Sequence, residues 1–64
     1  MKPHMQRVWN EREALDDKRE ALDAFLGSDI FKGLDPAEQG RLRRQLSVMT
    51  TYSLILTARL DAAR

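Results

Sequence analysis

Cysteine is absent from this chain of 64 residues, which excludes disulfide bonds and every metal site built on thiolate ligands. Histidine occurs once, as His4, so a structural zinc site is not expected either. A domain of this size buries only about 60% of its unfolded surface, and small domains commonly add a disulfide, a metal or a partner chain. We therefore expect no metal and no cofactor, and self-association is the source of stability that is left.

Long hydrophobic runs and a strong excess of one charge sign are missing as well. No stretch of 18 or more apolar residues occurs, so no segment is expected to span a membrane. Residues 1–7 lack the apolar core of a signal peptide. Eleven Lys and Arg against ten Asp and Glu give a net charge of +1, which is too weak for a general nucleic-acid-coating protein. We expect a cytoplasmic protein whose partners include neither a membrane nor DNA.

Catalytic motifs are also lacking. The chain has no glycine-rich phosphate loop and no metal-binding triad, and His4 has no Ser or Asp partner at a defined spacing. Sequence neighbours such as Asp16 and Asp17 point to different sides of a helix, so they do not form a carboxylate pair. Because so short a chain holds few residues rigidly around a reaction, we do not expect an enzyme.

Two long segments with helical periodicity are what the sequence does contain. In the first segment, apolar residues recur every seven positions and so form a stripe along one helix. The stripe consists of Val8, Leu15 and Leu22. Pro3 suits a first helical turn, and Gly27 suits the left-handed position just beyond a helix C-terminus. This pattern predicts a helix over about residues 3–26.

A connector over residues 27–34 separates the two segments. Ser28 is placed to cap a single helical turn that ends at Gly33. The connector is too apolar for a solvated loop, so its hydrophobic side chains are expected to close the end of a hairpin. These side chains are Ile30, Phe31 and Leu34.

The strongest local signal follows the connector. Asp35 supplies an N-cap carboxylate, Pro36 a first helical residue, and Glu38 a carboxylate three residues after the cap. Together they satisfy or remove unpaired backbone N–H groups. The second helix is therefore predicted over about residues 36–62. The whole chain, residues 1–64, is expected to be a single all-α domain, a helical hairpin with a short helical turn in its connector.

The second predicted helix carries apolar residues on more than one side. One row consists of Leu42, Leu46, Met49, Leu56 and Leu60. A second row, rotated around the helix, consists of Val48, Tyr52 and Ile55. Because the first helix covers only one of these rows, the other is expected to meet another copy of the protein. The prediction is a homo-oligomer of hairpins.

The two helices also differ in charge. Residues 11–23 hold six acidic and three basic side chains, a net of −3, whereas residues 41–64 hold five Arg against one Asp, a net of +4. Antiparallel packing of one on the other is favoured, although exposed ion pairs contribute little. Arg41, Arg43 and Arg44 are either a phosphate-binding patch or a solvated face that pairs with the acids of the first helix. The patch supports a less favoured alternative, a small nucleic-acid-binding protein, but apolar crowding argues against a DNA-reading helix.

The N-terminal residues gather cations and flat side chains, the combination that a nucleotide requires. The candidates there are His4, Arg7 and Trp9. The alternatives are an ordinary surface residue for His4 and a core or interface anchor for Trp9. Tyr52 is a second candidate for base stacking, although an interface role fits it better. Arg59 lies among apolar residues, so it should have an anionic partner, either a carboxylate or a bound phosphate.

The order of residues along nearly the whole chain resembles a known family. The residues that carry the resemblance are Pro3, His4, Gln6, Arg7, Val8, Glu11, Leu15, Lys18, Leu22, Phe25, Phe31, Leu34, Glu38, Leu42, Arg43, Arg44, Gln45, Leu46, Met49, Tyr52, Leu56 and Arg59. The pattern is similar to that of the phage anti-CBASS cyclic-nucleotide sponges, small proteins related to the crAss-like phage "48" open reading frame.

The resemblance implies a compact helical protein that assembles as a hexamer and acts in the host cell cytoplasm. Such proteins bind cyclic di- and trinucleotide messengers between subunits without cleaving them, so the effector of bacterial CBASS defence is starved of its activator. By resemblance, Lys18, which stands in the pattern Leu15-x-x-Lys18-x-x-x-Leu22, meets the ligand's phosphates. Arg59 matches a basic position late in the second helix and is the next candidate for phosphate contact.

This chain departs from the family near its N-terminus. The family's stacking aromatic residue falls near Pro3 and His4, where this chain has no Tyr. We expect His4 or Trp9 to stack on the base instead. The sequence leaves one further alternative open, a hairpin adaptor whose second apolar row binds a different protein.

Overall fold

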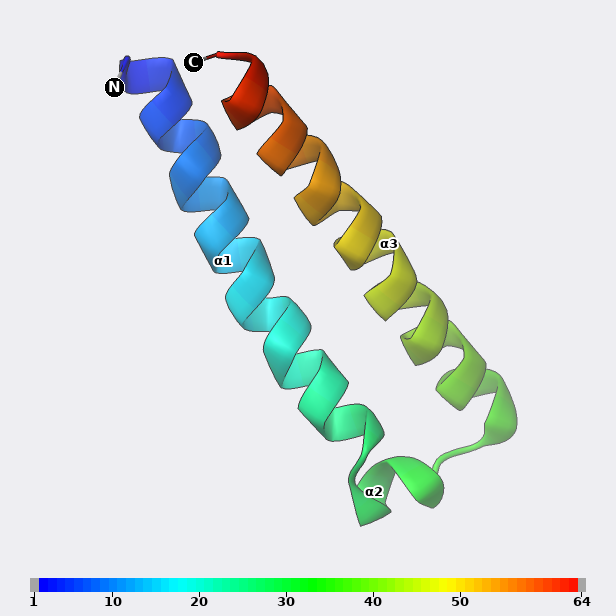
Figure 1. The fold of residues 1–64 in the computed structure, drawn as a ribbon. Coiled ribbons are helices and arrows are strands. Elements are labelled where there is room, and N and C mark those ends of the chain that lie inside the picture. The colour runs from blue at the N-terminus through cyan, green and yellow to red at the C-terminus, as the bar shows by residue number, and fades with distance from the viewer. Residues whose placement is uncertain (1, 64) are drawn as a thin grey trace.

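The computed structural model describes residues 2–63; Arg64, one of the basic residues counted above, lies outside the described residues, as does Met1. The helices are α1 over Pro3–Leu26, α2 over Asp29–Lys32 and α3 over Pro36–Ala62. Helices α1 and α3 run antiparallel with α2 at the turn, so α1 begins at the end of the hairpin where α3 finishes (Figure 1). The predicted all-α hairpin and its helical turn are confirmed, and both long helices have the predicted bounds.

The junction between α1 and α2 differs from the prediction. Gly27 has φ −91°, so the expected left-handed conformation is wrong. The chain instead turns tightly, with the Gly27 N–H donating to the carbonyl oxygen of Ala24 and the Ser28 N–H donating to that of Phe25. The Ser28 hydroxyl donates to the same Phe25 oxygen at 2.6 Å. Because Ser28 is already the N-cap of α2, the turn is short and closes without a left-handed residue.

Helix α2 is capped as predicted but closes the hairpin with fewer side chains than expected. The Ser28 hydroxyl accepts a hydrogen bond from the Phe31 N–H at 3.2 Å. Phe31 is buried and meets the ring of Phe25 edge-on, with 6.1 Å between ring centroids. Leu34 is half-buried. Ile30 is 71% exposed, so the prediction that it helps to close the end of the hairpin is wrong. Consecutive residues of one helical turn point in different directions, and Phe31 is the one that points toward the core.

The start of α3 is held by two polar side chains. The Asp35 carboxylate accepts from the Ala37 N–H at 3.1 Å, which confirms the predicted N-cap. Glu38 does not complete that cap, since its carboxylate accepts from the Arg41 guanidinium at 2.8 Å. The Gln39 amide instead reaches back across the turn and donates toward carbonyl oxygens of the connector at 3.0–3.3 Å. These belong to Phe31, Lys32 and Leu34.

The core is a narrow line between the two long helices. Leu56 is fully buried and Val8 is 4% exposed, and the rest of the first apolar row of α3 is half-buried against α1. The second row faces outward, with Val48 61%, Tyr52 41% and Ile55 53% exposed. The hairpin measures 46 × 14 × 13 Å and has no further layer among its described residues. As predicted, α1 covers only one of the two rows.

Candidate ligand-binding site

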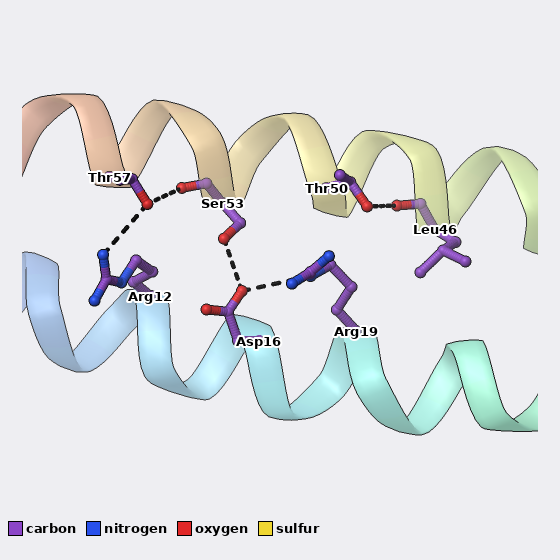
Figure 2. Close-up of polar contacts among 7 residues, drawn as sticks. All are labelled: Arg12, Asp16, Arg19, Leu46, Thr50, Ser53 and Thr57. Atoms are coloured by element: carbon purple, nitrogen blue, oxygen red, sulfur yellow. Dashed lines mark hydrogen bonds and ion pairs between the residues drawn. The ribbon is translucent and has the colours of Figure 1, made fainter.

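Polar side chains join α1 to α3 halfway along the hairpin (Figure 2). The Ser53 hydroxyl donates to the Asp16 carboxylate at 2.7 Å, and the Arg12 guanidinium donates to the Thr57 hydroxyl at 3.3 Å. We call these four residues the polar seam. The two contacts set Arg12 level with Thr57 and Asp16 level with Ser53. They therefore fix the register in which every other residue of the two helices is placed.

Arg19 extends the polar seam toward the turn without completing it. Its Nε lies 3.4 Å from Asp16 Oδ1 as an ion pair, yet that nitrogen is buried without a hydrogen-bond partner. A depression of about 300 Å³ opens beside it. The depression is lined by Arg19, Glu20, Asp23, Leu46 and Thr50. Two carboxylates against one guanidinium do not suit an anionic ligand, and none of the residues predicted to bind a ligand lines this depression.

Sequence reasoning missed the polar seam, although a signal for it exists. Ser53 stands where the first apolar row of α3 has a gap, four residues after Met49 and three before Leu56. Arg12 and Arg19 likewise fill the gaps between the apolar residues of α1 that recur every seven positions. Polar residues at such inward positions need partners, so they predict cross-helix hydrogen bonds.

Lys18 and Arg59 lie on the flank of the hairpin opposite the polar seam. Lys18 comes two residues after Asp16, and Arg59 two residues after Thr57. Two residues correspond to a rotation of about 200° around a helix, so the side chains of Lys18 and Arg59 point away from the polar seam. Tyr52 falls on the same flank, and the register sets it nearly level with Lys18. All three side chains are exposed. We call this side the basic flank.

His4 and Arg7 lie in the first turns of α1, and Arg59 lies in the last turn of α3. The start of α1 and the end of α3 lie at the same end of the hairpin (Figure 1). His4 and Arg7 are both exposed. Arg7 and Lys18 share one face of α1 because eleven residues are close to three full turns, and they stand about 16 Å apart along the axis. The hairpin thus brings Arg7 near the level of Arg59, whereas Lys18 and Tyr52 form a separate group farther along.

Trp9 is separated from the other candidates. The guanidinium carbon of Arg12 lies 4.4 Å from the centroid of the Trp9 ring, so a cation–π contact already covers one face of the indole. Since Arg12 belongs to the polar seam, Trp9 lies on that side of the hairpin and not on the basic flank. Within one hairpin, Trp9 and Tyr52 are therefore not brought together.

The arginines at the start of α3 do not pair with acids of α1. Arg41 is held by Glu38 of its own helix. The guanidinium carbon of Arg43 lies 5.1 Å from the centroid of the Phe31 ring. Arg44 is exposed. The expected pairing with α1 is wrong for Arg41 and Arg43, because nearer partners in α3 and α2 take both side chains.

Three general features of the described residues bear on what the protein can bind or cross. Within residues 2–63, Lys18 and Arg59 have neither a hydrogen bond nor an ion pair, so their charges are available to an anion. No cluster of three or more metal-ligand side chains is found in the same range. None of the described helices is long and apolar enough to cross a bilayer.

The fold and this flank define a small all-α hairpin protein with exposed cations and an uncovered apolar row. A model of the Sequestin family matches residues 2–62, so the chain belongs to the Sequestin family. This match confirms the resemblance to phage sponge proteins, and the family's name indicates that a ligand is sequestered. Among curated proteins and solved structures, none matches the chain.

Proposed function

We propose that this protein is a phage-encoded sponge that binds cyclic di- and trinucleotide messengers in the host cell cytoplasm. By holding these messengers without cleaving them, it denies CBASS effectors their activator. The observation that supports this most strongly is the basic flank, where Tyr52 exposes its ring and Lys18 and Arg59 are exposed without an anionic partner among residues 2–63. Cations and a flat ring are the groups that recognise phosphates and bases.

The proposed ligand requires more than one copy of the hairpin. A rod 14 by 13 Å in cross-section is too thin to enclose a ligand with two bases and two phosphates. The exposed row of α3 gives a reason for copies to associate, since burying apolar side chains is favourable. A pocket between subunits then combines cations and rings from several chains. By resemblance, the assembly is a hexamer.

The energy of such a site is sufficient for tight binding. Stacking of a base on an aromatic ring contributes about 1–3 kcal/mol, and a hydrogen bond to a charged group about 1.5–3 kcal/mol. Two stacked bases and several contacts to two phosphates approach about −12 kcal/mol, which corresponds to nanomolar affinity. Sequestration needs affinity of this order, because a sponge must compete with the effector for the same messenger.

Isothermal titration calorimetry with a panel of cyclic di- and trinucleotides tests the function. We expect Lys18→Ala to weaken binding about 10-fold to 100-fold, the loss of one charged hydrogen bond to phosphate. Lys32→Ala is the matched control, because this exposed lysine pairs with Asp29 at the turn, away from the basic flank, and should leave affinity unchanged. Heat from none of the nucleotides would refute the function. Wild-type affinity of the Lys18→Ala variant would refute only the assigned site.

A protein-interaction adaptor is the second candidate, and the uncovered row of Val48, Tyr52 and Ile55 is the observation that favours it. The two functions differ in what covers this row. Light scattering at micromolar concentration separates them, because a sponge of the proposed kind is a stable homo-oligomer and an adaptor awaiting another protein is a monomer.

A further inference from the structure

The exposed face of α3 has a palindromic order. Val48 and Ile55 are equally distant from the midpoint between Thr51 and Tyr52, and Arg44 and Arg59 are equally distant from it farther out. Spacings of three, four and seven residues keep all of them on one face of the helix. We call this face the α3 stripe; it consists of Arg44, Val48, Thr51, Tyr52, Ile55 and Arg59, all exposed.

A palindromic face is complementary to a second copy of itself. In a two-fold contact, residue i of one chain meets residue j of the other, and j meets i. Antiparallel packing of α3 on a second α3 sets Val48 against Ile55 of the second copy, and Ile55 against its Val48. Antiparallel packing also opposes the two helix dipoles, which is favourable. A foreign partner would have no need for this symmetry, so the order of the stripe indicates a second copy of this chain.

The same register brings positive charges together at both ends of the contact. Arg44 of one copy meets Arg59 of the other, and Arg7 lies in the adjacent α1 near the level of Arg59. Glu11, one turn from Arg7 on the same face of α1, adds one carboxylate on that face. Three guanidinium groups against one carboxylate repel one another unless an anion lies between them.

The apolar part of the stripe contributes only modestly to pairing, and this repulsion weakens the pairing further. Stable interfaces bury about 800 Å² on each partner. Val48, Tyr52 and Ile55 are already 39–59% covered within the hairpin, so they supply only a fraction of that area. An anion that bridges the two arginines changes the repulsion into attraction at each end. Pairing and anion binding therefore favour each other.

We propose that two copies pair antiparallel through the α3 stripe and that each end of the contact forms a phosphate site from Arg44 of one copy and Arg59 of the other. The two sites of a pair are about 22 Å apart along the helix, so each holds its own phosphate group. The proposal deepens the proposed function and rests on it in one respect, that the phosphate groups belong to a cyclic oligonucleotide. It adds Arg44 to the binding residues and makes the site incomplete in a single chain.

Disulfide trapping tests the register, and the chain contains no native cysteine to interfere. We expect an equimolar mixture of Val48→Cys and Ile55→Cys chains to form a mixed disulfide dimer under mild oxidation. Each variant alone should cross-link at least about tenfold more slowly, because position 48 faces position 55 and not itself. Faster cross-linking of Val48→Cys with itself than of the mixture would overturn the antiparallel register.

Sedimentation velocity with and without inorganic pyrophosphate, at matched ionic strength, tests the anion site. Pyrophosphate should strengthen association of the wild type about fivefold or more, and Arg44→Ala should abolish this effect. Arg44→Glu should associate without pyrophosphate, because it places a carboxylate against Arg59 of the second copy. Arg43→Ala carries the same loss of charge off the stripe and should respond like the wild type. Equal responses of the wild type and Arg44→Ala, or weaker association of Arg44→Glu, would overturn the proposal.

These experiments separate the failure of this inference from the failure of the proposed function. If cyclic nucleotides bind with wild-type affinity to Arg44→Ala and pyrophosphate leaves association unchanged, the sponge function stands and the two-chain phosphate site falls. If pyrophosphate drives pairing through Arg44 while no cyclic nucleotide binds, the site stands and its ligand is a different phosphate compound.

Discussion

Single residues determine the strength and the register of the contact between the two helices. Asp16 is the centre of the polar seam, since it accepts a hydrogen bond from Ser53 and forms an ion pair with Arg19. Ser53 is only 8% exposed, so its hydroxyl depends on this partner. A polar group at an inward position adds little net stability but penalises a shifted pairing, in which it would lie buried without a partner.

Asp16→Ala should therefore destabilise the hairpin by about 1–2 kcal/mol, because it leaves the Ser53 hydroxyl and the Arg19 guanidinium without their acceptor. Asp17→Ala is the matched control: it removes the same chemical group from an exposed position and should change stability by less than about 0.5 kcal/mol. Urea unfolding at one fixed protein concentration measures both. An equal effect of the two substitutions would show that the polar seam does not stabilise the fold.

The short helix α2 is stabilised by its capping residue and by contacts across the turn to α3. This helix has too few residues to be stable by itself. Ser28 caps the helix, and Phe31 packs its buried side chain into the core. The amide of Gln39 in α3 donates toward carbonyl oxygens of the connector. These contacts set the position of the turn and therefore where α3 begins relative to α1.

Gly40 provides a test at the scale of a helix. It lies inside α3, and a Cβ added there meets nothing within 4 Å. Gly40→Ala should therefore stabilise the protein by about 0.5–1 kcal/mol, because alanine has the lower entropy cost of becoming helical. Thermal unfolding followed by circular dichroism measures the change. Gly27→Ala, just outside a helix, should give a smaller gain. A loss of stability in Gly40→Ala would instead reveal a close approach of another copy at this turn.

At the scale of the whole molecule, the hairpin leaves much of its apolar surface uncovered. Among residues 2–63, three hydrophobic side chains are buried, while six large ones are exposed to different degrees. The exposed ones lie on several sides of the hairpin. The α3 stripe combines apolar side chains at helical spacing with flanking cations. We therefore place association between copies on that face.

Ile55→Lys should abolish self-association while leaving the hairpin folded, because it places a charge in the middle of the α3 stripe and removes nothing from the core. Leu54→Lys is the matched control, since Leu54 is 66% exposed and, at about 100° from Ile55, lies off the stripe. Sedimentation equilibrium reports the mass, and helicity reports the fold. Association that survives Ile55→Lys, or fails equally in Leu54→Lys, would contradict this assignment.

Much of the fold follows from local signals in the sequence. Pro3, the cap at Ser28 and the Asp35-Pro36 pair act through neighbouring backbone groups, so the helix bounds needed no knowledge of distant residues. The outcome for Ile30 and Gly27 depended instead on how the turn packs, which local patterns do not specify. The sequence predicted the arrangement of the candidate site less well than the fold. The hairpin separates Trp9 from Tyr52 and leaves every candidate cation exposed.

The sequence by itself determined the two long helices and the two apolar rows of α3, because periodicity and the signals at helix ends are properties of consecutive residues. Which of the two rows α1 covers was decided by packing. Tertiary structure alone decided that Asp16 meets Ser53, that Arg12 occupies one face of Trp9, and that Lys18 shares a flank with Tyr52 and Arg59. The physical reason is the rotation between the helices. Which side chains of α1 stand level with those of α3 is fixed only when the two rods pack and their inward polar groups find partners.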